Sequence, residues 1–131
     1  MKKDIETRGD IEHLMEQFYQ KLIPDTIVGY IFTDVAKLNL SEHLPVLADF
    51  WEIILLGTGN YKGNVMLKHL ELNNKTALLP EHFERWKKLF FETLKELYSG
   101  PVADEAIRRV NLMEGLMQFK IEQQRDKNKL V

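Results

Sequence analysis

The sequence predicts a single all-α domain, on three observations. Apolar residues recur at intervals of three and four over four long segments, which is the spacing of amphipathic helices. No segment alternates apolar and polar residues as a half-buried strand does, and there is no repeat or low-complexity tract. The chain has 131 residues, enough for one core without disulfides but too few for a second catalytic domain. We expect one domain over residues 1–131, with an N-terminal arm at 1–9 and a frayed C-terminal tail at 125–131.

The first long helix is expected after Asp10, a residue that often caps helices. Its apolar positions recur at helical spacing and are Ile11, Leu14, Met15, Phe18 and Leu22. Pro24 ends this pattern, because proline lacks the amide hydrogen that a helix interior needs. Residues 25–38 are mixed around Gly29, and we expect one or two short helical turns there.

A second long helix is predicted from a cap at Ser41 to about Leu56, where Gly57 stops it. Pro45 fits only near its first turn, where a missing amide hydrogen costs least. Residues 57–64 are rich in glycine and asparagine and are expected to be flexible. Residues 65–70 have room for only two helical turns, and the polar residues 73–75 follow.

A third long helix should open at Pro80 and run to about Tyr98, and a joint at Gly100 and Pro101 should separate it from the last helix. The last helix is predicted from Val102 to about Gln124, with apolar residues over a wide arc. A plain bundle does not explain why residues 57–79 are so irregular. That irregularity favours a fold that parts its helices around a cofactor.

Composition excludes several classes of function. The net charge of -2 gives no broad basic field for nucleic acid, and no stretch approaches the roughly 20 apolar residues of a membrane span. The absence of cysteine removes zinc–cysteine sites, iron–sulfur clusters, thiol nucleophiles and covalent haem attachment. Residues 1–8 contain no apolar run that could act as a signal peptide, so we expect a cytoplasmic protein without nucleic-acid or membrane partners.

Five residues with a polar tip on a largely apolar side chain sit where helical periodicity points them inward. They are Tyr19, His43, Trp51, His69 and Trp86. Each alone has an ordinary interpretation as a core aromatic or a surface histidine. Because a buried N–H or O–H needs a partner, five together indicate an interior built around a ligand.

Two of these residues suggest what the ligand is. His69 lies on a short helix between flexible segments, where its imidazole could reach the metal of a planar cofactor. His43 begins a helix face that continues through Leu47, Phe50, Trp51 and Ile54. That face would form an apolar wall with a polar group at one end, which suits a flat apolar ligand.

Several short segments, in this order, resemble those of the third group of truncated haemoglobins. The segments are Leu14-Met15-Glu16-Gln17-Phe18-Tyr19, Ile31-Phe32, His43, Asp49-Phe50-Trp51, Leu55-Leu56-Gly57, Gly59-Asn60-Tyr61-Lys62-Gly63, Lys68-His69-Leu70 and Arg85-Trp86-Lys87-Lys88-Leu89-Phe90. The resemblance covers roughly residues 10–120, nearly the whole chain. The glycine pairs typical of the other two truncated groups are missing, which agrees with the third group.

The resemblance implies a two-over-two helical globin sandwich that holds haem b. It implies His69 as the proximal iron ligand, and Tyr19, His43 and Trp86 on the distal side. Phe32 would pack against the porphyrin, with Leu47, Phe50 and Trp86 also lining the cofactor. Lys68 and Arg85 are candidate partners for the haem propionates, on charge and neighbourhood alone.

The implied function is binding of oxygen, nitric oxide or another diatomic ligand at the haem iron. A buried hydroxyl or indole N–H that donates to a partly negative ligand contributes about 1.5–3 kcal/mol, and about 1.4 kcal/mol is a tenfold change in an equilibrium constant. Two such donors would slow oxygen release, which suits nitric-oxide dioxygenase-like or peroxidase-like chemistry better than oxygen transport. Redox turnover would need an external reductase. We expect a monomer or weak oligomer.

Two other interpretations stay open at this stage. A cofactor-free helical interaction module would use the same aromatic residues as core, and it predicts a colourless protein. A nucleotide enzyme is suggested by Gly57, Gly59 and Gly63, but that spacing is one residue too long for the dinucleotide fingerprint and no parallel-sheet pattern surrounds it. The two other histidines, His13 and His82, are expected at the surface or at the pocket edge.

Overall fold

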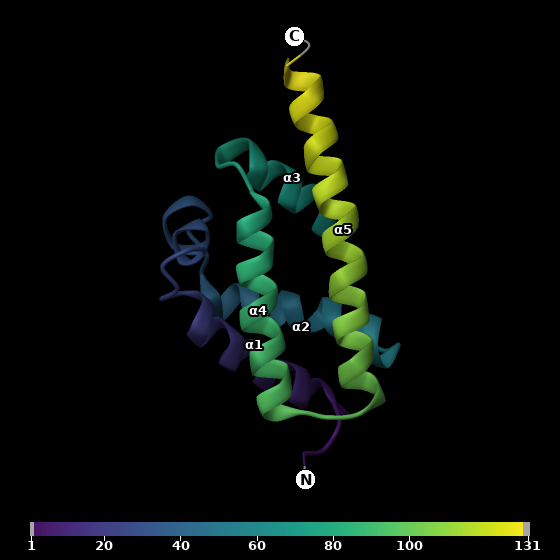
Figure 1. Cartoon of the computed structure of the whole chain (residues 1–131). Helices are drawn as coiled ribbons and strands as arrows, with labels where there is room; N and C mark the ends of the chain where they lie inside the picture. The colour runs from purple at the N-terminus through teal and green to yellow at the C-terminus, as the bar shows by residue number, and fades with distance from the viewer. Residues whose placement is uncertain (1, 130–131) are drawn as a thin grey trace.

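The computed structural model describes residues 2–129 and confirms an all-α fold, with no strand in that range (Figure 1). The helices are α1 (Arg8–Leu22), a π-helical turn η1 (Ile31–Val35), α2 (Leu40–Leu56), α3 (Val65–Lys75), α4 (Pro80–Leu97) and α5 (Pro101–Lys129). None of the helices in the described range is both long and apolar enough to cross a lipid bilayer.

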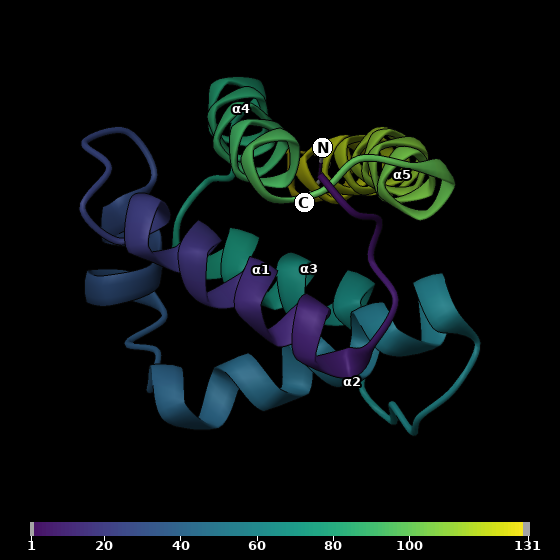
Figure 2. The ribbon, with the colours of Figure 1, turned by 90° about the horizontal axis from the view of Figure 1, so that it is seen from below.

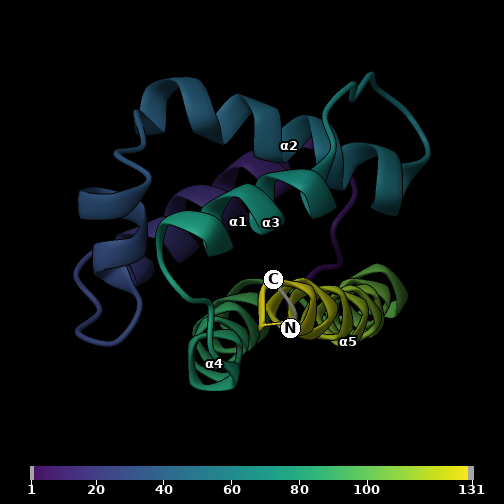
Figure 3. The ribbon, with the colours of Figure 1, turned by 90° about the horizontal axis from the view of Figure 1, so that it is seen from above.

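The helices form two layers. Figures 2 and 3 show α4 and α5 running alongside each other on one side, with α1, α2 and α3 on the other. Helix α1 packs against α2 and α4, whereas α3 packs against α5. The short helix α3 therefore belongs to a different part of the packing from α1, and the segment 57–64 that leads to it runs around the outside of the molecule.

The core is built on aromatic rings at the crossing of α1, α2 and α4. Phe18 and Phe90 are fully buried, with ring centroids 5.2 Å apart. Trp51 from α2 stacks on Phe90 at a centroid distance of 5.6 Å, and Trp86 stacks on it at 5.1 Å. Arg8 adds an ionic link between α1 and α2, because its guanidinium lies 2.6 Å from Asp49 and 2.9 Å from Glu52.

The N-terminal arm is part of the fold, and the predicted start of α1 was wrong. Thr7, not Asp10, is the N-cap, while Asp10 is the third helical residue and completes a capping box with Thr7. Ahead of it, Ile5 is 1% exposed and joins the core. The carboxylate of Asp4 accepts hydrogen bonds from the amides of Val102 and Ala103, so it caps α5 from the other end of the chain.

Gly100 makes this cap possible. Its φ of 145° is open to glycine, and a Cβ there would lie 2.5 Å from the carboxyl carbon of Asp4. The joint predicted at Gly100 and Pro101 is confirmed, with α5 beginning at Pro101.

Other helix boundaries moved by a few residues. Asn39 caps α2 in place of Ser41, and its side chain accepts from the Ser41 amide, which puts Pro45 two residues deeper in the helix than predicted. Gly57 ends α2 with a φ of 71°, as predicted. Helix α5 continues to Lys129, so residues 125–129, which were predicted to be a frayed tail, are helical. Residues 130–131 of the predicted tail lie outside the described range.

Helix α3 is longer than predicted, because it includes the polar residues 73–75. The amide of Asn73 bonds to Gln124 of α5, and its oxygen accepts from the backbone of Leu78. These tertiary contacts hold polar residues in a helix that their local preference would have ended.

Candidate functional site

Tyr19 and His43 meet between α1 and α2. Tyr19 is 5% exposed, and its hydroxyl oxygen lies 3.1 Å from Nε2 of His43, within hydrogen-bond distance. Phe32 from η1 presents its edge to the Tyr19 ring at a centroid distance of 5.9 Å. Burial raises the pKa of Tyr19 and lowers the pKa of His43, so both side chains are neutral at pH 7. The hydroxyl therefore keeps a proton that it can donate.

Trp86 lies on α4 next to the same aromatic cluster. Its ring stacks on Phe90, and Phe18 stands edge-on between it and Tyr19, with centroid distances of 5.0 Å to Trp86 and 5.4 Å to Tyr19. The side chain is half-buried, and its indole N–H makes no hydrogen bond within residues 2–129. Trp86 is thus a second available donor, whereas Trp51, at 4% exposure, belongs to the core.

His69 is half-exposed on α3 and has one ring nitrogen engaged and one available. Its Nδ1 lies 2.8 Å from the backbone carbonyl oxygen of Val65, one turn earlier, and must carry the proton because a carbonyl oxygen only accepts. Nε2 then holds the lone pair. Burial lowers the pKa of His69 more than the Val65 bond raises it, so the ring is neutral at pH 7. A neutral imidazole oriented by a backbone carbonyl is the usual form of a metal-ligating histidine.

The imidazole of His69 suits a metal whose other ligands are supplied by a cofactor and not by the protein. Residues 2–129 contain no group of three or more His, Asp or Glu side chains able to hold a metal ion. The imidazole of His69 alone cannot complete a site for a bare ion, which normally needs three or more protein ligands. It does suit the axial position of an iron held in a macrocycle.

Many apolar side chains of α2 and α3 are only half covered. Helix α2 is strongly apolar, yet it buries only Ala48 and Trp51, and α3 buries no residue at all. Leu47 and Phe50 on α2 are half-buried, in the positions predicted to line a cofactor. An uncovered apolar surface of this kind fits a flat hydrophobic cofactor.

Phe32 links this surface to a second, smaller cluster. The cluster is built on Ile31, Leu78 and Ile121, with Phe32, Leu70, Leu72 and Phe83 packed against it. Phe32 also packs against the main core, so it stands where the two clusters meet. The sequence did not mark Leu70, Leu72 or Phe83 as site residues, because their apolar side chains carry no chemical signature.

The two charged residues predicted near a cofactor differ in the structure. Lys68 is exposed and makes no ion pair within residues 2–129. Arg85 is committed elsewhere, since its guanidinium lies 2.7 Å from the carboxylate of Asp25. Burial alone would raise the pKa of Asp25, but the Arg85 bond and the amides of Val28 and Ile27 lower it. Arg85 therefore anchors the segment after α1.

The remaining histidines serve other purposes. His13 is exposed on α1, as expected. His82 accepts a hydrogen bond from the Leu79 amide at Nδ1, which caps α4, and its Nε2 lies 3.3 Å from the Tyr30 hydroxyl. Its Nε2 must then carry the proton, so His82 has no free lone pair for a metal.

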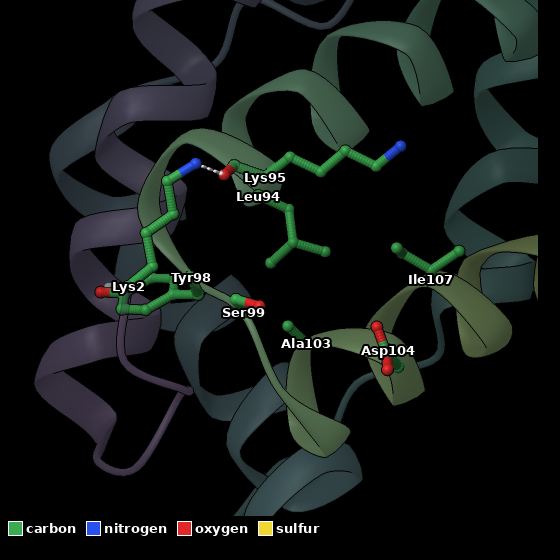
Figure 4. A pocket seen from close by; sticks show the side chains of 8 residues that line it. All are labelled: Lys2, Leu94, Lys95, Tyr98, Ser99, Ala103, Asp104 and Ile107. Atoms are coloured by element: carbon green, nitrogen blue, oxygen red, sulfur yellow. Dashed lines mark hydrogen bonds between the residues drawn. The ribbon is translucent and has the colours of Figure 1, made fainter.

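A separate hollow lies where the N-terminal arm meets the joint between α4 and α5 (Figure 4). It has a volume of about 650 Å³ and is lined by Lys2, Leu94, Lys95, Tyr98, Ser99, Ala103, Asp104 and Ile107. None of the predicted site residues lines it.

The backbone carbonyl of Val65 is the site feature that sequence reasoning missed. A signal was available, because Val65 precedes His69 by four residues, and a helix brings such positions together. A search for a proton acceptor one turn before each candidate histidine would have found it.

A two-layer helical sandwich, in which the short helix α3 carries an imidazole with a free Nε2 lone pair and α2 leaves apolar side chains half-buried, is the architecture of a truncated globin. No model of a known protein family matches the chain. It is 33% identical over 116 residues to a group 3 truncated haemoglobin of Campylobacter jejuni, covering 86% of this chain and 89% of that protein. It also matches the crystal structure of group III truncated haemoglobin from Campylobacter jejuni with a TM-score of 0.81 and 31% identity, over 92% of this chain and 95% of that one. The chain belongs to the group III truncated haemoglobins.

Proposed function

We propose that this chain binds haem b through Nε2 of His69 and uses it to bind oxygen, nitric oxide or another small ligand. The observation that carries the proposal is the hydrogen bond from His69 Nδ1 to the Val65 carbonyl, which leaves Nε2 as a neutral nitrogen donor. Family membership supports the cofactor, and the half-covered apolar residues of α2 and α3 support its place in the fold.

When bound, haem iron supplies a coordination position for a diatomic ligand or peroxide. The contribution of α3 is to hold the imidazole ring. The Val65 carbonyl fixes which nitrogen is protonated and makes the other a better electron donor. Phe32, Leu47 and Phe50 provide apolar contact and exclude water. Lys68 offers an unpaired ammonium group for a carboxylate of the cofactor.

Tyr19, His43 and Trp86 are proposed to act on the ligand side. If His43 carries its proton on Nε2, it donates to the Tyr19 oxygen and leaves the Tyr19 hydroxyl proton free to point at a ligand. The indole N–H of Trp86 is a second donor near the same aromatic cluster. Each bond to a partly negative ligand contributes about 1.5–3 kcal/mol, so release of oxygen should be slow.

Slow release favours chemistry on the ligand over oxygen transport. The same two donors would stabilise negative charge that develops when a ligand is reduced or attacked. We propose nitric-oxide dioxygenase-like or peroxidase-like activity. Electrons would come from an external reductase, because the described fold contains helices alone and offers no sheet of the kind that binds nicotinamide.

The visible absorption spectrum tests the proposal. The full chain is supplemented with haem and recorded in ferric, ferrous and carbon-monoxide forms. We expect a Soret band that shifts with the ligand and is lost or altered by His69→Ala. His82→Ala is the matched control, since its ring has no free lone pair, and it should leave the spectrum unchanged.

A colourless protein after supplementation would reject the proposal and favour a cofactor-free helical interaction module. A Soret band of unchanged position and intensity in His69→Ala would reject His69 as the iron ligand while leaving haem binding in place.

A further inference from the structure

Helix α3 carries His69 but is only weakly held by burial. None of its eleven residues is buried, and the helix that it packs against is α5. The segment 57–64 that precedes it runs around the outside of the molecule (Figure 3). Parts of a fold with few buried apolar contacts open most readily. The contacts that hold α3 therefore decide how firmly His69 is placed.

Apolar contacts hold the C-terminal half of α3 to the end of α5. Leu70 and Leu72 of α3 pack against the small cluster that contains Ile121 of α5 and Leu78 of the connection between α3 and α4. Ile121 is only 2% exposed, although it lies near the end of the longest helix. Figure 1 shows the C-terminal part of α5 passing beside α3. The end of α5 therefore has a packing role.

Asn73 ties the last turn of α3 to α5 through a side chain of fixed orientation. Its Oδ1 accepts from the backbone amide of Leu78 at 2.9 Å. Because an amide N–H can only donate, this contact identifies the oxygen of Asn73 and leaves Nδ2 on the other side. Nδ2 donates to Oε1 of Gln124, also at 2.9 Å.

Arg125 adds a second bond from α5 to the same place. Its Nη2 lies 2.6 Å from the carbonyl oxygen of Leu78, so both backbone groups of Leu78 are engaged. We refer to Asn73, Leu78, Gln124 and Arg125 as the clasp. The clasp lies at the stretch of α5 where the sequence predicted the helix to end and fray.

The clasp is one helical turn from His69. Asn73 follows His69 by four residues, so the two share a side of α3 and are about 6 Å apart along its axis. The Val65 carbonyl holds the imidazole relative to α3, whereas the clasp holds α3 relative to the rest of the fold. Both are needed to place Nε2 at a fixed point.

We propose that Gln124 and Arg125 are positioning residues for His69, which hold the end of α3 against α5 so that the imidazole stays in place on the iron. This inference rests on the proposed function, in which His69 binds haem. Contacts behind a metal-ligating histidine tune its orientation and the affinity for the metal. His69 can release the iron only when α3 moves away, so loss of haem should follow the opening of α3.

Gln124→Ala in the haem-loaded full chain tests the proposal. We expect the opening of α3 to rise about two- to tenfold, the value of one hydrogen bond. Hydrogen exchange of the α3 amides measures this opening. Transfer of haem to an excess of another haem-binding protein measures its loss, which should rise by the same factor.

A third readout separates positioning from a general loss of stability. The iron–imidazole stretching band of the ferrous protein, recorded by resonance Raman spectroscopy, reports how the His69 ring is held. We expect this band to broaden in Gln124→Ala, because the ring then takes up more orientations. A merely structural role of Gln124 would leave the band unchanged.

Two variants are matched to this one. Gln123→Ala removes the same side chain from the exposed neighbouring position and should behave as wild type. Gln124→Glu keeps an oxygen that can accept from Nδ2 of Asn73, so it should restore slow haem loss and a narrow band.

Arg125→Ala tests the other bond of the clasp. It should raise α3 opening and haem loss and broaden the band as Gln124→Ala does, since the Leu78 carbonyl loses its partner. Lys120→Ala is its control, because it removes one positive charge from an exposed position on the same helix.

The outcomes distinguish this inference from the proposed function. A wild-type chain that binds no haem, or that binds it without His69, overturns both. If wild type holds haem through His69 and the band is unchanged in Gln124→Ala and Arg125→Ala, the positioning role alone is overturned. Haem loss raised equally by Gln123→Ala would overturn it as well.

Discussion

The hydroxyl of Tyr19 is held by His43 and kept protonated by burial, so a single atom can be removed to test its role. Tyr19→Phe preserves the ring and its contacts with Phe18 and Phe32. In haem-loaded protein we expect the oxygen dissociation rate to rise about 10–100-fold, the value of one charge-assisted hydrogen bond. Stopped-flow measurement with carbon monoxide as the displacing ligand gives the rate.

Tyr30→Phe is the control for this substitution. Tyr30 is exposed and its hydroxyl faces His82, so its loss should not affect ligand release. An unchanged rate in Tyr19→Phe would remove the Tyr19 hydroxyl from ligand binding and leave Trp86 as the donor to test next.

Individual residues also show the limits of what the sequence could predict. Helical periodicity placed Tyr19 and Trp51 inside correctly, because burial follows from spacing alone. The pairing of Tyr19 with His43, and of Arg85 with Asp25, joins residues on different elements. Such pairs depend on how the helices cross and on side-chain rotamers, which no local pattern encodes.

At the scale of elements, the cap that Asp4 provides to α5 should contribute to stability. Asp4→Ala removes the acceptor for two amides at the start of the longest helix. We expect the free energy of unfolding to fall by about 1–2 kcal/mol, the usual value of an N-cap. Urea unfolding monitored by circular dichroism measures it, and Glu6→Ala, which changes an exposed neighbour, should cost much less.

Retention of wild-type stability in Asp4→Ala would mean that water replaces the carboxylate at this helix end. Asp4→Asn separates the two parts of the interaction, because the amide oxygen still accepts one bond but carries no charge toward the helix dipole.

Two glycines should respond to alanine in opposite ways. At Gly29, a Cβ would lie 2.3 Å from the carbonyl oxygen of Ile23, so the backbone of a buried turn must move. At Gly115 nothing lies within 4 Å. We expect Gly29→Ala to destabilise the protein by about 1–3 kcal/mol and Gly115→Ala to stabilise it by about 0.5–1 kcal/mol. Thermal unfolding compares them, and equal effects would contradict the geometry at Gly29.

Element types were easier to predict than their ends. The long helices, the stop at Gly57 and the start at Pro80 follow from periodicity and from glycine and proline chemistry. The start of α1 was misplaced because aspartate is favoured both as a cap and as the third helical residue. The end of α3 was misplaced because Asn73 is held by partners on other elements.

For the whole molecule, the buried carboxylate of Asp25 links stability to pH. Its pKa is lowered below the ordinary value of 3.8, so the stability it contributes is present above that value and is lost as the pH falls through its native pKa. Asp25→Asn should therefore be less stable than wild type by about 1–3 kcal/mol at pH 7.

The difference between the two proteins should shrink as the pH drops toward 2, because wild-type Asp25 is then protonated as well. Urea unfolding at pH 7 and at pH 3 or below measures it. A stability difference that stays constant over this range would show that the Arg85 ion pair contributes no pH-dependent stability.

The cap that Asp4 forms on α5 also orders events during synthesis on the ribosome. Its backbone partners are translated 98 and 99 residues later, roughly 5–20 s at about 5–20 residues per second. Until then Asp4 and the arm that carries it have nothing at the far end of the chain to bind. The arm is thus made well before α5, yet Asp4 can reach its final place only after the first turn of α5 has been made.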